Sequence, residues 1–440
     1  MSHAIERPTD ITVPPTSLWA KMPMIAGVVG VAGTGFTIAM MFGDHKDRAF
    51  FAYLFAFAFT LSIALGALAF VLIQHATRAG WSAVVRRIAE TAMATLPLFA
   101  VLFIPIAVLG FHTLYPWSHE TDKFLEAKRW WLGAELGNGS GNKFYMRAVI
   151  FFGIWTLLSQ LLYRWSLAQD NLGDNKTERD AITRKLWTLS AGGIFLFALS
   201  QSFAAIDWLM SLQPHWYSTM FGVYFFAGSM VGFYAFLAVV TMSLQKYGMI
   251  TKAVTTEHYH DIGKFAFGHT VFWGYIAFCQ FMLIWYANIP EETEYYMMRM
   301  AGGWDKISLA IPFVVFFIPF FLTLSRHVKR SRVGLLIAGI YLLFAHALDL
   351  YWAVIPNAGA HGEKAPGTEH AVVEAGAAGS GELATAVHHG AHFGIALVDV
   401  AAFVGIVGLF LALFSFLLQR NKVICIGDPR LDESLKHENY

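Results

Sequence analysis

Apolar runs separated by short polar stretches repeat along nearly the whole chain. A helix needs about 20 apolar residues to cross the hydrocarbon core of a bilayer, and ten runs approach or exceed that length. Backbone groups inside a membrane have no water to bond, so each run is expected to be helical. The ten predicted spans are Met22–Phe42, Ala49–Gln74, Ala92–Phe111, Ala148–Tyr163, Leu186–Leu212, Phe221–Leu244, Phe265–Pro290, Ile307–Ser325, Val333–Ile355 and Phe393–Gln419.

This pattern predicts an all-α polytopic membrane protein. Residues 1–21 and 420–440 are polar terminal segments, and residues 22–419 form the membrane domain. The first segment lacks the apolar stretch of a cleavable signal peptide. The run Ala148–Tyr163 is short and is expected to extend at both ends.

Lys and Arg are divided unevenly between the two sides of the predicted membrane domain. Ten spans place both termini on one side, and that side carries 21 of the 31 Lys and Arg residues. Connections rich in Lys and Arg usually face the cytoplasm. Both termini are therefore predicted to be cytoplasmic.

Two connections on the opposite, outer side are long. Residues 112–147 include Trp117, Trp130 and Trp131 and are expected to form a folded cap or a partner surface. Residues 357–392 are rich in Ala, Gly and His, which predicts a flexible excursion. The spacing of these histidines fits no defined metal site, so none is predicted there.

Composition excludes several other classes of protein. Only 14% of the residues are charged, against about 25% in ordinary soluble domains. The formal net charge of +1 gives no support to nucleic-acid binding. The chain has two cysteines, Cys279 and Cys425, and no CxxCH motif, so no covalently bound haem and no iron–sulfur cluster is expected in this chain.

Ionisable side chains within the runs are functional candidates, because such groups are costly at membrane depth. Asp207 and Asp349 lie near the outer ends of the fifth and ninth runs, and His346 precedes Asp349 by three residues on nearly the same helix face. These three predict an outer site for protons or quinol. The remaining candidates are Glu90 and His269 for an inner proton path, and Asp399 as a weaker outer candidate.

An apolar middle separates the outer set from the inner one, which resembles two half-channels more than one continuous proton wire. The alternative is that each acid bonds a facing helix or headgroup water and only fixes packing. Water reaching Asp399 from the long loop is one such explanation. His269 and His346 differ in depth by several turns, which argues against a b-type haem held between them.

Aromatic residues lie beside proline at the outward ends of the fifth, seventh and ninth runs. Most of this pattern is explained by the preference of Trp and Tyr for the lipid–water boundary. The other interpretation is that these rings wall a quinone pocket. The residues are Trp208, Trp285, Tyr286 and Trp352.

Three long segments resemble a known family. They read AIDWLMSLQPHWYSTMFGVYFFAG (Ala205–Gly228), EHYHDIGKFAFGHTVFWGYIAFCQFMLIWYANIPEE (Glu257–Glu292) and HALDLYWAVIPN (His346–Asn357). They are similar to the NrfD/PsrC-like membrane subunits of alternative complex III, a bacterial quinol:cytochrome c oxidoreductase unrelated to the cytochrome bc complex. The likeness is to the second such subunit, quinone-binding subunit 2 or the F subunit, and covers most of the chain from the second span to the ninth.

The resemblance implies two four-helix bundles, about residues 49–212 and 221–355, flanked by the first and last spans. It implies a bacterial cytoplasmic (inner) membrane and partners that include c-type haem proteins, an iron–sulfur subunit, a homologous NrfD-like subunit and a terminal oxidase. The cofactor it implies is a quinone, menaquinone or ubiquinone. Asp207, His346 and Asp349 match the outer polar positions of the family.

Two other functions are compatible with the sequence. A secondary transporter usually has helices broken near the midplane, whereas prolines here cluster at span ends, apart from four at 97, 105, 312 and 319. A structural scaffold for cytochrome subunits would need neither protons nor quinol.

Overall fold

The computed structural model describes residues 8–119, 125–126, 128–132, 142–173, 175–359 and 392–438. These residues form helices and connecting segments, with no strand among them. Ten helical segments in these ranges are long and apolar enough to cross a membrane. The chain is therefore an all-α multi-pass membrane protein, which confirms the predicted fold class.

Ten spans follow one another along the chain. They are α1 (Leu18–Met40), α2 (Lys46–Ala76), α3 (Ala83–Met93) continued by α4 (Leu96–Leu102) and α5 (Ile104–Val108), α9 (Asn142–Asp170), α10 (Lys176–Trp208) continued by η2 (Met210–Leu212), α11 (Phe221–Lys246), α12 (Thr256–Ala287), α14 (Trp304–Ile311) continued by η3 (Pro312–Phe317) and α15 (Ile318–Leu324), α17 (Arg332–Val354) continued by η4 (Ile355–Gly359), and α20 (Leu397–Arg420). Shorter helices connect them: α6 (Phe111–Leu114), η1 (Pro116–Ser118), α8 (Arg129–Leu132), α13 (Pro290–Met298), α16 (Arg326–Arg330) and α21 (Leu431–Leu435).

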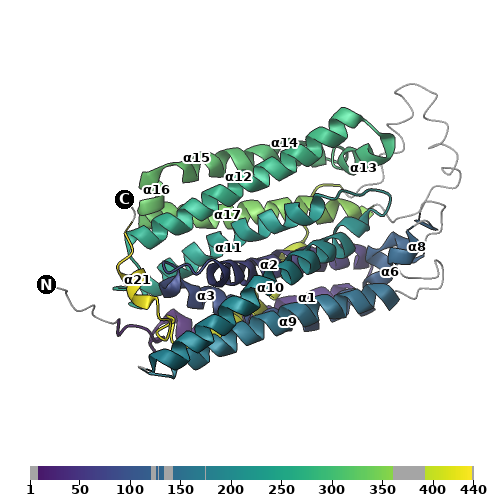
Figure 1. Cartoon of the computed structure of the whole chain (residues 1–440). Coiled ribbons are helices and arrows are strands. Elements are labelled where there is room, and N and C mark those ends of the chain that lie inside the picture. Colours follow the sequence, from purple (N-terminus) through teal and green to yellow (C-terminus); the bar gives the residue numbers. More distant parts are fainter. Residues whose placement is uncertain are drawn as a thin grey trace, which may run out of the picture.

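The first described residues, which lead into α1, lie with α16 and α21 at one end of the elongated molecule, whereas α6, α8 and α13 lie at the other end (Figure 1). We call these the terminal end and the loop end. Each span runs from one end to the other, so the helices stand roughly side by side along the long axis of the molecule.

The helices α2 and α11 form the centre of the membrane domain. The sequence of α2 is apolar on every side, as expected of a helix surrounded by protein, and nearly all of its residues are buried. The two helices cross closely at Gly66, where a Cβ atom would lie 2.5 Å from the Ser229 carbonyl oxygen. A side chain at that position would force the two central helices apart.

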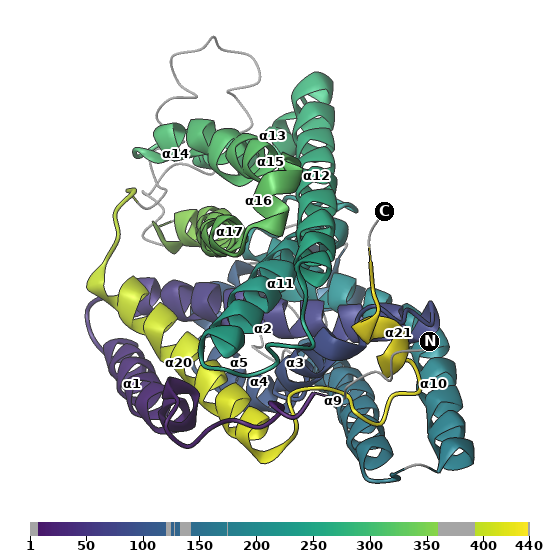
Figure 2. The same ribbon diagram turned by 90° about the vertical axis from the view of Figure 1, so that its left-hand side faces the viewer.

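The other spans pack around this centre in two groups and a pair. A first group contains α2, α3 to α5, α9 and α10, and a second contains α11, α12, α14 to α15 and α17. The pair α1 and α20 packs along one edge, as seen from the terminal end in Figure 2.

Glycines bring α1 and α20 together. A Cβ on Gly33 would lie 2.8 Å from the Cα of Gly405, and one on Gly408 would lie 2.8 Å from the Cα of Gly30. Small residues let transmembrane helices approach until their backbones touch, which replaces the hydrophobic driving force that lipid cannot supply.

The third and eighth spans are interrupted where proline occurs inside them. Between α3 and α4 the backbone at Thr95 stays in the right-handed helical region (φ −79°, ψ −8°), so the span turns slightly and is not unwound. In the eighth span, the π-helix η3 lies between Pro312 and Pro319. Proline lacks an N–H group, and the Tyr341 hydroxyl donates to the Val314 carbonyl at 3.0 Å, which satisfies an acceptor within the irregular turn.

The observed helix limits confirm one boundary prediction and correct several others. The helices α10 and α12 begin at Lys176 and Thr256, before the predicted Leu186 and Phe265. The helix α9 extends beyond Ala148–Tyr163 at both ends, as expected. The third span begins at Ala83 and not at Ala92, so Arg86 and Arg87 belong to a buried helix and not to a connecting loop. The last span begins at Leu397 and not at Phe393, because the backbone at Ala396 is still extended.

The seam between α1 and α20 gives a first prediction. Gly33→Leu should destabilise the protein by about 1–3 kcal/mol, because the added side chain collides with the backbone of α20. The measurement is the thermal unfolding midpoint of the purified protein in detergent, followed by tryptophan fluorescence. Gly35→Leu is the matched control, since no atom lies within 4 Å of a Cβ at Gly35 on the same helix. Equal midpoints for the two variants would disprove close packing at Gly33.

Candidate functional site

The first outer candidate, Asp207, lies in the last turn of α10 and is 2% exposed. The Arg147 guanidinium from α9 donates to both of its oxygens, at 2.5 and 3.1 Å. The Trp131 indole from α8 donates to Oδ1 at 3.0 Å. The negative charge is thus neutralised by a two-point ion pair that also fixes the connection between α5 and α9 onto the first helix group.

Asp399, the weaker candidate, is also paired. It lies in the first turn of α20, and Arg48 at the start of α2 donates to its two oxygens at 2.9 and 2.5 Å. The Tyr351 hydroxyl adds a bond of 2.9 Å to Oδ2. Asp399 is 3% exposed, so its charge is balanced within the protein by the ion pair with Arg48.

Asp349 has a different environment. It lies on α17 one to two turns before the loop end of that helix, and it is 1% exposed. Its Oδ1 accepts a hydrogen bond from the Tyr224 hydroxyl of α11, and its Oδ2 accepts one from the Trp273 indole of α12 at 3.1 Å. Among the described residues no Lys or Arg forms an ion pair with it. Asp349 is therefore a buried carboxyl group held only by neutral donors.

His346 lies one turn before Asp349 and is 2% exposed. Its Nε2 lies 2.8 Å from the Ser62 hydroxyl of α2. Its ring fits against two glycines of α11, since a Cβ on Gly232 would lie 2.7 Å from the ring and one on Gly228 would lie 3.0 Å from it. Both His346 and Asp349 thus face α11 at the centre of the domain, although no hydrogen bond joins them directly.

A buried cation lies just beyond Asp349. Arg299, between α13 and α14, is 1% exposed, and it donates to the carbonyl oxygens of Trp352 at 3.2 Å and Ala353 at 2.8 Å. Burial lowers the pKa of Arg299 from its ordinary value. The guanidinium caps the end of α17, where helix carbonyls carry partial negative charge. The nearby positive charge is held by the backbone and leaves the Asp349 carboxyl group without a direct ionic partner.

This arrangement can hold a proton reversibly. Burying an unpaired carboxylate is costly, whereas the neutral acid avoids that cost. The Tyr224 hydroxyl can donate to the carboxylate or accept a bond from the protonated acid, because a hydroxyl is both donor and acceptor. Asp207 and Asp399 cannot change charge in this way without breaking an ion pair.

The inner candidate Glu90 belongs to a buried charge cluster on the terminal side. Its Oε1 lies 3.2 Å from Arg86 Nε and its Oε2 lies 3.1 Å from Arg87 Nη1, and Glu90 itself is fully buried. Asp170 of α9 binds Arg87 at 2.6 Å, and Asp428 binds Arg86. Two guanidinium groups and three carboxylates thus form one largely buried network of ion pairs. These pairs explain how a helix can bury both arginines, which precede the predicted start of the third span at Ala92.

The C-terminal segment completes this cluster and covers the terminal end. Burial alone would raise the pKa of Asp428, but the Arg86 guanidinium outweighs it, and the pKa lies below its ordinary value of 3.8. Burial also raises the pKa of the Cys425 thiol to about 12, so Cys425 stays protonated and donates to Glu90 at 3.6 Å. Glu90 is therefore closed off by its own chain.

The other inner candidate is not part of that cluster. His269 on α12 is partly exposed, its Nδ1 lies 2.8 Å from the Phe265 carbonyl oxygen, and its ring lies 5.1 Å from that of Tyr234. The partners of Glu90 among the described residues do not include it. A proton path that joins Glu90 and His269 stays a prediction without a direct contact to support it.

The four aromatic candidates divide into two kinds. Trp208 and Trp352 are buried, the first against Phe103 with ring centroids 4.6 Å apart and the second with its indole donating to Ser308 at 2.8 Å. Trp285 and Tyr286 are 67% and 84% exposed at the loop end of α12. The exposed pair fits the lipid–water boundary, and the structure does not bring the four together around one pocket.

The described residues contain no group of three or more His, Cys, Asp or Glu side chains that could hold a metal ion. Most of the His-rich segment 357–392 lies outside those residues, so the expectation for it is not tested.

Sequence reasoning missed the residues that decide the charge state of each acid. Arg147 and Arg48 fall outside or at the edges of the predicted runs, and Tyr224 and Trp273 look like ordinary apolar positions within them. In their contacts with Asp207, Asp399 and Asp349, the two paired residues are 60 to 351 positions apart in the sequence. No local sequence pattern predicts contacts between residues that are so far apart.

The charge cluster gives a second prediction. Asp428→Asn should lower the free energy of unfolding by about 3–5 kcal/mol at neutral pH, because Arg86 loses a buried partner. A carboxyl group whose folded pKa is depressed stabilises the protein above its ordinary pKa, and that contribution disappears as the pH falls through the folded pKa. The difference between wild type and variant should therefore be constant at neutral pH and shrink below about pH 4.

Chemical denaturation in detergent over this pH range measures that difference. Asp432→Asn is the control, since Asp432 belongs to the same C-terminal segment but is exposed. A gap between wild type and Asp428→Asn that persists unchanged to pH 3 would show that the ion pair is not its source.

No protein-family model matches the chain, and a search of curated proteins finds no significant relative. The side chains gathered around Asp349 are therefore the main structural basis for a functional assignment.

Proposed function

We propose that the protein is an integral membrane subunit of a respiratory quinol:cytochrome c oxidoreductase of the alternative complex III type. In this proposal Asp349 accepts and releases protons. The observation that carries it is a carboxyl group buried among membrane-spanning helices and held by Tyr224 and Trp273, to which no Lys or Arg in the described part of the chain is paired.

The three segments that resemble the family meet at this carboxyl group. Tyr224 lies in the segment Ala205–Gly228, Trp273 lies in Glu257–Glu292, and Asp349 lies in His346–Asn357. Segments that are separate in the sequence thus contribute one contact each to one site. A resemblance that coincides with a buried ionisable group supports a chemical role for these segments better than a resemblance spread over lipid-facing positions would.

In the proposed mechanism, the loop end faces the outer side of the bacterial cytoplasmic membrane and the terminal end faces the cytoplasm. The Tyr224 hydroxyl passes a proton to or from Asp349 along their hydrogen bond. His346 and Ser62 lie one turn deeper and extend the polar path toward the centre of the domain. Partner subunits would hold the haems and iron–sulfur clusters, and a quinol would supply the protons and electrons when bound to the assembly.

The inner half of such a path has less support. Glu90 is neutralised by two arginines and covered by the C-terminal segment. A proton taken up there would have to break a buried ion pair, which is costly. We therefore assign proton uptake and release to Asp349 and treat the Glu90 cluster as the support of the terminal end.

A purely structural role is the competing proposal, and the ion pairs of Asp207 and Asp399 favour it for those two residues. Such pairs attach α9 to α10 and α2 to α20 without any change of charge. The two proposals differ at Asp349, where a scaffold needs only the two hydrogen bonds and not an ionisable group.

The proposed assembly predicts that the chain is isolated together with haem proteins. An affinity-tagged chain, extracted from its native membrane in mild detergent, should carry additional subunits and a Soret band from c-type haem. Absorption spectra and mass spectrometry of the separated subunits measure this. A chain that elutes alone and colourless from gently solubilised membranes would contradict membership in such a complex.

Asp349→Asn should abolish proton release coupled to quinol oxidation in the intact complex. Proton transfer by a positioned acid or base contributes roughly a hundredfold or more to a rate, and the amide keeps the shape of the side chain but cannot ionise. Oxidation rates and external pH, followed with an indicator dye in liposomes, are measured together. Asp349→Glu should restore part of the release.

Asp305→Asn serves as the matched control, because Asp305 is an exposed carboxyl group at the loop end of α14. Full assembly of the Asp349→Asn complex with unchanged oxidation and proton release would refute the proton role and establish the scaffold.

A further inference from the structure

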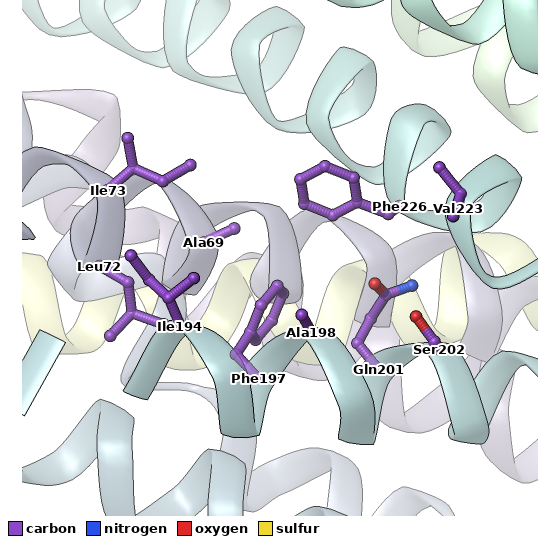
Figure 3. Close-up of a pocket in the computed structure, with 10 residues that line it drawn as sticks. All are labelled: Ala69, Leu72, Ile73, Ile194, Phe197, Ala198, Gln201, Ser202, Val223 and Phe226. Atoms are coloured by element: carbon purple, nitrogen blue, oxygen red, sulfur yellow. The ribbon is translucent and has the colours of Figure 1, made fainter. Parts of the chain in front are cut away.

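A groove lies where α2 and α10 of the first helix group meet α11 of the second. Its volume is about 170 Å³, and it is bounded by side chains of all three helices (Figure 3). Asp349 and the charge cluster do not line it. The lining residues are Ala69, Leu72, Ile73, Ile194, Phe197, Ala198, Gln201, Ser202, Val223 and Phe226.

The lining is apolar except at one end. Ala69, Leu72 and Phe197 are buried and form the floor, whereas Gln201 and Ser202 stand together at the end nearer the loop end of α10. The Gln201 amide donates to the Gly222 carbonyl oxygen of α11 at 3.3 Å. Water would find few polar partners along most of this groove.

The groove opens on a surface that faces lipid. Ala198, at its rim, is exposed, and its neighbours on α10 include Phe195, which is 73% exposed, and Leu199, which is 58% exposed. Large apolar side chains exposed on a membrane-spanning helix contact hydrocarbon. The medium at the mouth of the groove is therefore acyl chains and not water.

The dimensions match part of such a chain. From Ile194 to Ser202 the groove follows eight residues of α10, about 12 Å at 1.5 Å per residue, which is less than half the thickness of the hydrocarbon core. The groove runs parallel to the membrane-spanning helices, and acyl chains of the bilayer extend in the same direction. An empty apolar groove would deprive its walls of dispersion contacts.

One end of the groove is closed by the contact between α10 and α11. A Cβ on Gly222 would lie 2.6 Å from the Ser202 side chain, so the two helices touch there. Farther along, the ring of Phe226 meets Phe197 edge to face at 6.4 Å, and the remaining space between the helices is the groove. A ligand seated there would contact both helix groups at once.

We propose that this groove is a binding site for one acyl chain of a membrane phospholipid, which fills the junction between the two helix groups. The chain lies along α10 between Ile73 and Phe226, and its removal leaves α2, α10 and α11 with incomplete packing. The site does not depend on the proton role of Asp349.

Ala198→Trp tests the proposal, because an indole at the rim would occupy the space of the chain. Native mass spectrometry of the full chain, purified in mild detergent, should show a retained phospholipid for wild type and at least tenfold lower occupancy for the variant. Leu199→Trp is the matched control. Leu199 follows Ala198 in the sequence and is exposed, but it does not line the groove. This control should retain the lipid.

A second measurement applies even if Ala198→Trp fails to fold. Wild-type protein in vesicles of phosphatidylethanolamine and phosphatidylglycerol, with a trace of phospholipid carrying a diazirine in its acyl chain, is irradiated and digested. Cross-links enriched on residues 194–202 and 223–226 over the exposed face of α1 are expected. Equal labelling of both regions, or a quinone or no molecule retained in place of phospholipid, would overturn the proposal.

Discussion

The cost of holding a charged group away from water governs where this chain places its polar side chains. Each acid inside the helix assembly needs a cation, a set of strong donors or the ability to become neutral. Asp207 has Arg147, Asp399 has Arg48, and Glu90 has two arginines. These pairs link helices to one another, and Asp428 binds Arg86 of the same cluster. The electrostatic requirement that makes the acids costly therefore also fixes the packing of α9, α20 and the C-terminal segment.

Apart from these ion pairs, the interior is held together by close packing of the helices. Lipid is as apolar as the helices, so it gives no hydrophobic force for their association, and packing must supply the stability. Glycine allows this close packing at Gly66 between the central helices, and at Gly33 and Gly405 between α1 and α20. The groove beside α10 lies among exposed apolar side chains, where helix packing leaves room for the proposed acyl chain.

The number of spans and the fold class could be predicted, because membrane crossing depends on the local length of apolar runs. Which acids stay ionisable could not be predicted, because the answer depends on partners far away in the sequence. Arg86 shows the limit most clearly. A charge in a polar stretch indicates a connecting loop, yet Asp428 neutralises it from 342 residues away and lets α3 extend by more than two turns.

The three aspartates at the loop end illustrate what distinguishes support from chemistry. Replacement of a buried ion pair by apolar residues is often neutral for stability. The presence of such a pair therefore indicates a role in helix packing more than a chemical function. Asp349 forms no such pair with any residue that the structure describes, and its two donors come from helices that also hold the remaining segments of the family resemblance. A carboxyl group in that position can gain or lose a proton while the Tyr224 hydroxyl turns its own proton toward or away from it. Asp207, Asp399 and Glu90 each belong to an ion pair that would have to break first.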